Sequence, residues 1–468
     1  MAIQSAQVVL VGGKINQLAD AIRISRKTLT IIKQNLFWAF SYNIVAIPIA
    51  AFGYLTPTVA AFAMAFSDVI IKISGYIQNY HWGKKGSASL ISKYINNPSA
   101  EENYSEIWYG AHKSAPCALS GISHADVDDL YKFIRLNPLE ILGKKIAEKY
   151  SNDLPFLLKV LSIEKPLSIQ LHPDKKNAAA LHAVDPKNYP DANHKPEIAI
   201  ALSETHLIYG FRSPDQIKQL LRENEEYKLI LSQDIINQLE KFAARGDEQS
   251  YLKTLYPAVL NAAENQYKEA SSKYIQKLLS ANQHTPHEKL ALQTAKEYGE
   301  RDLAILTVPL MNYKIMQPSE AIFIEPNMLH AYISGDLLEC MANSDNVIRA
   351  GMTPKHKDIP HLLQVLKYTC KEPNIITPQK SNNFQDSFLY PAACEEFIIE
   401  VHKNNGSLTI ENNDNVSSLV FCLEGRAELV TDRENAEMRP GSACFIPAHV
   451  KKFTLKKQQA FLVRVTSR

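Results

Sequence analysis

A stretch near residue 320 recurs in weaker form near residue 440, and this echo constrains the fold more than any other feature of the chain. The two copies are MQPSEAIFIEPNMLHAY (316–332) and MRPGSACFIPAHVKKF (438–453), aligned with one gap. The matched positions are Pro318 with Pro440, Phe323 with Phe445, and Pro326 with Pro447. Each copy has the pattern of a turn, a strand and a second turn before the next strand. The repetition predicts two β-barrel units.

Strand-like segments flank a helical region. Short apolar strands are predicted within 156–172 and 197–211, and the strand pattern returns after the helical region. At the start of that region, Ser213 has the character of a helix N-cap and Pro214 that of a first helical residue. Apolar residues then recur at helical spacing. We therefore predict a helical insertion over residues 213–300.

These patterns predict a mainly β fold that is divided into four parts. The predicted parts are an N-terminal segment (1–73), a first β-domain (74–212 with 301–375), the helical insertion (213–300) and a second β-domain (376–468).

Composition limits the partners and the compartment. The net charge is +2, so the chain has no strong overall field that would attract nucleic acid. Six cysteines are spread over 468 residues, and none forms a CxxC pair. This usage favours free thiols in a reducing compartment, and no signal peptide is recognised. We therefore expect a cytoplasmic location.

The N-terminal segment contains two apolar stretches. Residues 36–55 carry no charge and, if helical, have about the thickness of one bilayer. Residues 58–73 are shorter and are interrupted by Asp68 and Lys72. Basic residues on both outer flanks favour a helical hairpin with both ends on the cytoplasmic side. The pattern predicts membrane association through residues 36–73; the alternative is a buried helical pair on a soluble domain.

Four polar side chains interrupt apolar strands and make a set of metal ligands. Gln170 and His172 lie two apart in PLSIQLHPDKK, so in a strand they share one face. Glu197 opens the apolar run EIAIAL, where a carboxylate needs a partner. With His330 they form a nitrogen and oxygen set that suits zinc. Each histidine alone is more often a hydrogen-bonded core residue, so spacing leaves both interpretations open.

The echo bears on where this metal would bind. His330 in the first copy falls opposite Lys451 in the second copy. The second β-domain is therefore predicted to be metal-free.

Five motifs carry a resemblance to a known family. They are YIQNYHWG (76–83), EIWYGAHKSAP (106–116), QLHPDKK, DANHKPEIAIAL and LHAYISGDLLECMANSDNVIRAGMTPK. In this order they closely resemble type I mannose-6-phosphate isomerases, from about residue 74 to the C-terminus. The resemblance implies a zinc-dependent enzyme with cupin-type β-barrels and a helical domain. It also implies interconversion of mannose 6-phosphate and fructose 6-phosphate.

The resemblance implies one zinc ion, held by Gln170, His172, Glu197 and His330. The implied proton shift through an enediol needs an electrophile, a general base and cations for the phosphate. The candidates for catalysis are Arg349, Asp345, His194 and Glu339. The candidates for substrate binding are Ser168, Lys159, Lys195 and Lys355. We expect a monomer whose partner is the sugar phosphate.

A second resemblance concerns residues 1–72, which are similar to the C-terminal end of heavy-metal-transporting P-type ATPases. The residues that match its metal-binding motifs are Tyr42, Asn43, Met64 and Ser67, with Asp68 in place of a second serine. The chain has no DKTGT phosphorylation motif, so ATP-driven transport by this chain alone is excluded. Two alternative functions follow. One is a non-catalytic sugar-phosphate-binding cupin, and the other is a membrane metal-binding remnant.

Overall fold

The computed structural model describes residues 29, 33, 70–120, 127–381 and 386–468. Residues 36–69 of the predicted hairpin, including the motif residues Tyr42, Asn43, Met64 and Ser67, lie outside the described residues, whereas its end at Ile71–Ile73 belongs to a β-strand. Within the part of the chain that is described, no helix is both long enough and apolar enough to cross a membrane. Residues 68–468 form one compact unit.

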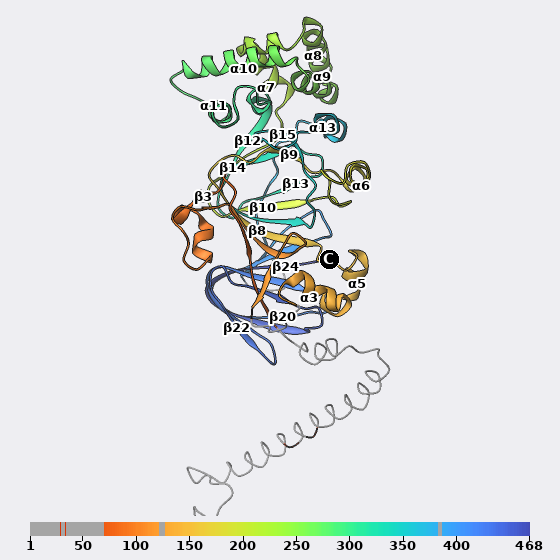
Figure 1. The fold of residues 1–468 in the computed structure, drawn as a ribbon, viewed down its shortest axis with the longest axis vertical. Helices are drawn as coiled ribbons and strands as arrows, with labels where there is room; N and C mark the ends of the chain where they lie inside the picture. The colour runs from red at the N-terminus through yellow and green to blue at the C-terminus, as the bar shows by residue number, and fades with distance from the viewer. Residues whose placement is uncertain (1–28, 30–32, 34–69, 121–126, 382–385) are drawn as a thin grey trace, which may run out of the picture. The chain divides into compact units, whose positions relative to one another are not determined.

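Two large sheets make up most of this unit (Figure 1). The first has 12 strands and the second has 10. The strands of the first sheet are β2 (Tyr76–Gln78), β5 (Glu106–His112), β6 (Ala115–Pro116), β8 (Phe156–Ile163), β9 (Ile169–Leu171), β10 (Glu197–Ala201), β11 (Thr205–Phe211), β12 (Met311–Met316), β13 (Ala321–Ile324), β14 (His330–Ala342), β15 (Ile348–Gly351) and β16 (Ile375–Ile376). The strands of the second are β1 (Ile71–Ser74), β7 (Ala118–Ser120), β17 (Gln379–Lys380), β18 (Ser387–Tyr390), β19 (Ile398–His402), β20 (Gly406–Glu411), β21 (Ser418–Val430), β22 (Asn435–Met438), β23 (Ala443–Ile446) and β24 (Lys452–Thr466). The mainly β prediction is confirmed, while closure of the sheets into barrels stays a prediction.

The two copies of the sequence echo adopt the same local arrangement. In the first copy, β13 is followed by a turn and then by β14, which begins at His330. In the second copy, β23 is followed by a turn and then by β24, which begins one residue after Lys451. The predicted order of turn, strand, turn and strand is confirmed.

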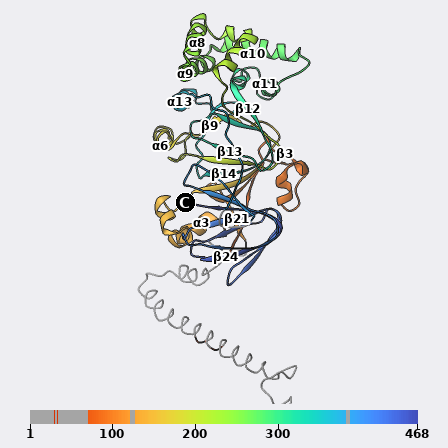
Figure 2. The same cartoon turned by 180° about the vertical axis from the view of Figure 1, so that it is seen from behind.

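Helices occupy the region between β11 and β12, at one end of the unit (Figures 1 and 2). They are α7 (Pro214–Glu223), η3 (Glu225–Leu229), α8 (Gln233–Arg245), α9 (Glu248–Leu260), α10 (Glu264–Leu279), α11 (Pro286–Tyr298), α12 (Ala304–Thr307) and η4 (Val308–Leu310). The predicted start of the first helix is confirmed, because the Ser213 side chain accepts from the Gln216 amide in a capping box and Pro214 opens the helix. Elsewhere lie η1 (Gly86–Ala88), η2 (Leu90–Tyr94), α3 (Leu130–Leu136), α4 (Pro138–Ile141), α5 (Lys144–Lys149), α6 (Lys175–Val184) and α13 (Ile359–Val365).

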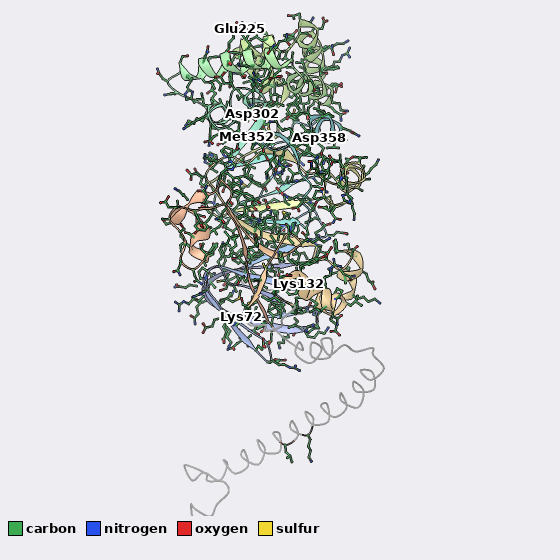
Figure 3. The ribbon with its side chains drawn as sticks, viewed as in Figure 1. Lys72, Lys132, Glu225, Asp302, Met352 and Asp358 are labelled. Carbon is green, nitrogen blue, oxygen red and sulfur yellow. The ribbon has the colours of Figure 1, made fainter. Side chains whose placement is uncertain are left out.

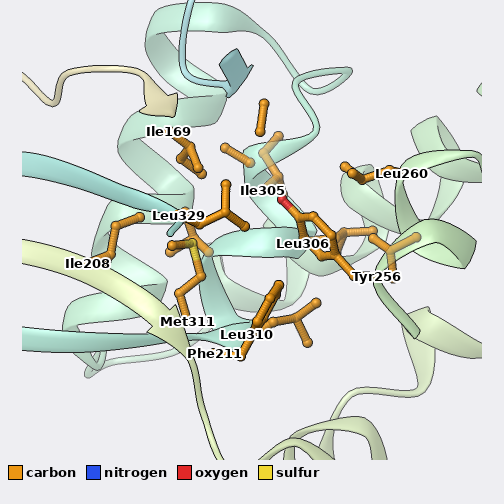
Figure 4. Close-up of a cluster of buried hydrophobic side chains, with 14 of the residues drawn as sticks. Ile169, Ile208, Phe211, Tyr256, Leu260, Ile305, Leu306, Leu310, Met311 and Leu329 are labelled. Carbon is orange, nitrogen blue, oxygen red and sulfur yellow. The ribbon is translucent and has the colours of Figure 1, made fainter. Parts of the chain in front are cut away.

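The helical region shares a hydrophobic core with the first sheet (Figure 4). Ile169 and Leu171 of β9 are fully buried in this core, together with Tyr256 from α9. Because successive side chains of a strand point to opposite faces, Gln170 between them faces the other side of the sheet. Packing against the helices thus fixes which side of β9 is available for a functional site.

A second connection holds the strand β15 against the end of the helical region. The Asp302 carboxylate accepts the backbone N–H of Met352 at 2.9 Å and that of Ala304 at 2.9 Å (Figure 3). Met352 directly follows β15 and has a positive φ of 54°. The buried Asp302 carboxylate therefore anchors the end of the strand that carries Arg349.

The strand β1 lies at the end of the predicted N-terminal segment and belongs to the second sheet. It pairs with β23, where Ile71 faces Phe445, and with β7, where Ile73 faces Leu119. Ile71 is completely buried, and Ile70 belongs to the core of this sheet. The predicted boundary between residues 73 and 74 therefore falls inside a strand, and the folded unit already includes Ile70.

A chain that begins at Asp68 should unfold with the same free energy as the folded unit of the full chain. A chain that begins at Ser74 should be much less stable, because it lacks Ile70, Ile71 and Ile73. Full burial of an isoleucine contributes about 1.5–3 kcal/mol, and the pairing of β1 with β7 and with β23 is lost as well. Urea unfolding followed by circular dichroism measures the difference. Equal stabilities for the two shortened chains would show that β1 is not part of the folded sheet.

Candidate metal centre and active site

Three of the predicted ligands meet inside the first sheet. Glu197 opens β10, His330 opens β14, and His172 directly follows β9. The His172 Nε2 atom lies 3.2 Å from Glu197 Oε2, and the His330 Nε2 atom lies 3.3 Å from Glu197 Oε1. All three residues are completely buried. The structure thus gathers two imidazoles and one carboxylate around a single point.

The atoms that face this point have no hydrogen-bond partners. Among the residues that the structure describes, His172 Nε2, Glu197 Oε2 and His330 Nε2 are buried polar atoms that make no hydrogen bond, although Lys195 Nζ lies 3.3 Å from Glu197 Oε2. Nearly all buried polar groups in proteins are hydrogen-bonded, so three converging exceptions need an explanation. Two histidine nitrogens and one carboxylate oxygen are a donor set that zinc prefers. The residues therefore fit a metal ion.

Backbone carbonyls fix the orientation of both imidazoles. The Nδ1–H of His172 donates to the carbonyl of Asn346 at 3.0 Å, and that of His330 donates to the carbonyl of Met328 at 3.0 Å. Since a carbonyl can only accept, the proton of each neutral ring sits on Nδ1. The Nε2 lone pairs are then free for a metal, as in most histidine metal sites.

Gln170 lies beside this cluster by its strand register. It pairs directly with His330 of β14 on one side and with Arg349 of β15 on the other. Directly opposite residues of antiparallel strands have their side chains on the same face. Gln170, His330 and Arg349 therefore form one row across three strands. Ser168 supports the row, because its hydroxyl donates to Gln170 Oε1 at 3.2 Å.

Electrostatics give the cluster the protonation states that a metal requires. Burial alone would raise the pKa of Glu197, but the neighbouring Lys195 and His172 lower this pKa well below the usual range. The Lys195 Nζ atom lies 3.3 Å from Glu197 Oε2. Burial, aided by Lys195, lowers the pKa of His172 to about 4. Tyr332 donates its hydroxyl to Glu197 Oε1 at 3.1 Å. At neutral pH the carboxylate is ionised and His172 is neutral, as metal ligands must be.

A buried ion network lies next to the cluster. The Lys159 Nζ atom is 3.5 Å from Glu339 Oε1 and 3.6 Å from Glu106 Oε2, and it lies 4.5 Å above the ring of Trp108. Burial alone would lower the pKa of Lys159, but the Glu106 and Glu339 carboxylates outweigh it and raise the pKa. Burial, together with the charge of Glu197, raises the pKa of Glu339. The network places a permanent positive charge close to the metal ligands.

Two cations have no anionic partner. In the described part of the chain, no carboxylate lies within ion-pair distance of Arg349 or Lys355. Burial lowers the pKa of both residues, and the charge of Arg349 lowers that of Lys355 further. The Lys355 Nζ atom lies 5.7 Å from the centre of the Tyr80 ring. Two neighbouring positive charges without a counter-ion form a site for an anion such as phosphate.

Asp345 and His194 line a cavity of about 330 Å³ whose lining does not include the three metal-ligand candidates. The Asp345 side chain is 46% exposed, and its Oδ2 lies 3.2 Å from His112 Nε2. Burial would raise the pKa of Asp345, but His112 lowers it. His194 instead pairs with Glu396, at 2.7 Å between Nε2 and Oε1. The structure therefore directs His194 toward Glu396, while its neighbour Lys195 faces Glu197.

Sequence reasoning missed several residues of the site. Tyr332 could have been found, because it lies two residues after His330 in a strand and so shares its face. Glu106 also carried a signal, since it opens an apolar run as Glu197 does. Nothing in the sequence indicates that the Asn346 carbonyl orients His172, because this contact joins residues 174 positions apart.

Comparisons with known proteins show which family the chain resembles. The family described as phosphomannose isomerase type I, catalytic domain, matches residues 70–214, and the mannose-6-phosphate isomerase cupin domain matches residues 387–466. Mannose-6-phosphate isomerase of Saccharomyces cerevisiae is 34% identical over 425 residues, which covers 84% of this chain and 97% of that protein. Mannose-6-phosphate isomerase 2 of Arabidopsis thaliana is 32% identical over 401 residues, which covers 82% of this chain and 90% of that protein. A solved mannose 6-phosphate isomerase bound with zinc and yttrium aligns with a TM-score of 0.73 at 29% identity, over 85% of this chain and 99% of that chain.

Proposed function

This chain belongs to the type I mannose-6-phosphate isomerase family, and we propose that it interconverts mannose 6-phosphate and fructose 6-phosphate at the His172–Glu197–His330 cluster. Gln170 completes the proposed ligand set for one zinc ion, because its register places it beside His330. The observation that carries the proposal is the convergence of three buried ligand atoms that make no hydrogen bond. A bound zinc ion would supply positive charge that polarises a sugar oxygen.

The remaining residues of the site have roles that follow from their charges. Asp345 is the proposed base, because its lowered pKa keeps the carboxylate ionised and able to accept a proton, and because the carboxylate is accessible from the cavity. It takes the proton from C2 of mannose 6-phosphate and returns it to C1, while the O2 proton moves to O1. Lys159 and Lys195 stabilise the negative charge that develops on the enediol oxygens. His194 and Glu339 stay candidates for the transfer between the oxygens.

Arg349 and Lys355 are the proposed binding groups for the substrate phosphate, with Ser168 as a hydroxyl donor nearby. A planar guanidinium can bind two phosphate oxygens at once. Arg349 shares a row with Gln170 and His330, so a phosphate held there keeps the sugar on the metal side of the sheet.

Arg349→Ala should lower kcat/KM for mannose 6-phosphate by about 10- to 150-fold, the equivalent of one charge-assisted hydrogen-bonding group at about 1.5–3 kcal/mol. Its zinc content should not change, because the side chain is not a ligand. A coupled assay for fructose 6-phosphate and metal analysis measure both quantities. The exposed Arg245→Ala, at the end of α8, is the matched control and should behave as the unchanged protein.

The same assay distinguishes the enzyme from a sugar-phosphate sensor. Binding of mannose 6-phosphate without any turnover in zinc-loaded protein would refute the proposed isomerase and favour the non-catalytic cupin. A normal kcat/KM in Arg349→Ala would instead refute the phosphate site alone.

We further propose that the folded unit acts as a monomer in the cytoplasm, where the six unbonded cysteines would stay reduced. The proposed parts are the four predicted from the sequence, except that the first boundary lies before Ile70 and that β1 and β7 belong to the second sheet. Membrane attachment through residues 36–69 is a separate proposal for the N-terminal segment, since Ile71 and Ile73 are buried in the sheet. Fractionation of the full chain beside a chain that begins at Asp68 tests it, because only the full chain should sediment with membranes.

A further inference from the structure

Ser344–Asn346 form the middle of the loop that connects β14 to β15. They contact both a metal-ligand candidate and the cavity that holds the proposed base. The carbonyl of Asn346 accepts the Nδ1–H of His172 at 3.0 Å and so orients a metal ligand. One residue earlier, the carboxylate of Asp345 lines the cavity of about 330 Å³. A displacement of this short loop would therefore disturb both the ligand and the proposed base.

The carboxylate of Asp191, on a distant segment, accepts hydrogen bonds from all three residues of this loop. Asp191 Oδ1 accepts the Ser344 hydroxyl at 2.8 Å and the Asn346 amide at 3.2 Å, while Oδ2 accepts the Asp345 backbone N–H at 2.9 Å. The Asp191 backbone carbonyl accepts the Asn346 amide as well, at 2.6 Å. All three loop residues thus donate to one aspartate. The carbonyl of Asn193 adds two contacts, from Ser344 at 3.1 Å and from Asn346 at 2.9 Å.

We propose that Asp191 is a positioning residue that sets the orientation of His172 and the place of Asp345 together, through the Ser344–Asn346 loop. Its effect on zinc binding stands on geometry alone, while its effect on Asp345 rests on the proposed function. Loop residues 343–347 belong to neither strand, so β-sheet pairing does not hold them in place. Hydrogen bonds to an ionised carboxylate are about twice as strong as neutral ones, so the Asp191 carboxylate is a stronger anchor for the loop than the Asn193 carbonyl.

A purely local role for Asp191 is the alternative, and Asp185 provides the comparison. Asp185 accepts the backbone N–H and the side-chain amide of Asn188, at 3.2 and 2.7 Å, within one turn of the chain. Asp191 makes a similar local bond, to the Asn193 backbone N–H at 2.9 Å. Only Asp191 adds bonds to the distant loop. The variants Asp191→Asn and Asp185→Asn therefore remove the same charge from two turns, and differ in the loop contact.

The test measures the zinc dissociation constant by competition with a chelator, and kcat and KM at saturating zinc. In Asp191→Asn we expect zinc to bind at least about tenfold more weakly, the usual effect of losing an outer partner of a metal ligand. We also expect kcat to fall at least about tenfold with little change in KM, because Asp345 acts on the reaction and not on the phosphate. Asp185→Asn should change neither quantity.

Three results would overturn the inference. They are unchanged zinc affinity, unchanged kcat at saturating zinc, and equal effects in the two aspartate variants. Should Asp191→Asn fail to fold, Ser344→Ala removes one contact of the same anchor and must weaken zinc binding and lower kcat; no effect there overturns the inference too. Absence of turnover in the unchanged protein would refute the proposed function, whereas the zinc affinities would still decide whether Asp191 orients His172.

Discussion

Replacement of His330 by alanine should remove most of the bound zinc and nearly all turnover, while the fold survives. His330 supplies a completely buried Nε2 atom whose direction is fixed by the Met328 carbonyl, so no other side chain can take its place. Loss of an outer partner already costs about 10- to 100-fold in affinity or activity, and loss of a ligand should cost at least as much. Zinc analysis, turnover of mannose 6-phosphate and circular dichroism measure the three parts of the prediction.

The fold should survive because its two other cores do not involve the metal cluster. The core that the helical region shares with the first sheet consists of apolar side chains and does not include His330, and the second sheet has a separate core. Lys451→Ala is the matched control, since Lys451 occupies the corresponding position in the second copy of the echo and its side chain is exposed. Equal losses of zinc in both variants would contradict the assignment of the metal to the first sheet and of the second sheet as metal-free.

Features that depend on near neighbours in the chain could be predicted from the sequence. The start of α7 follows from Ser213 and Pro214, because capping is a local interaction. The alternation around Gln170 likewise predicts which side of β9 faces the metal, once its apolar neighbours are assigned to the core. The same spacing of two residues relates Lys195 to Glu197, and their side chains meet at 3.3 Å.

Features that depend on distant partners could not be predicted in this way. His194 and Lys195 are adjacent and equally polar, yet one pairs with Glu396 and the other with Glu197. The segment that carries Glu396, 202 positions after His194, decides by its packing which of the two side chains faces the metal-ligand cluster. The pairing of β1 with β23 is of the same kind. The isoleucines Ile70, Ile71 and Ile73 fit a membrane span as well as a strand by composition, and only the partner strand distinguishes the two.

Removal of the metal tests the central claim, that one zinc ion at the His172–Glu197–His330 cluster supports the isomerase reaction. Chelation to a verified metal-free state should abolish conversion of mannose 6-phosphate, because the cluster then lacks the charge that polarises the sugar. Stepwise return of zinc should restore turnover in direct proportion to bound metal, with a maximum at about one ion per chain. Full turnover by verified metal-free protein would contradict the account, as would a titration in which turnover continues to rise beyond one bound ion per chain.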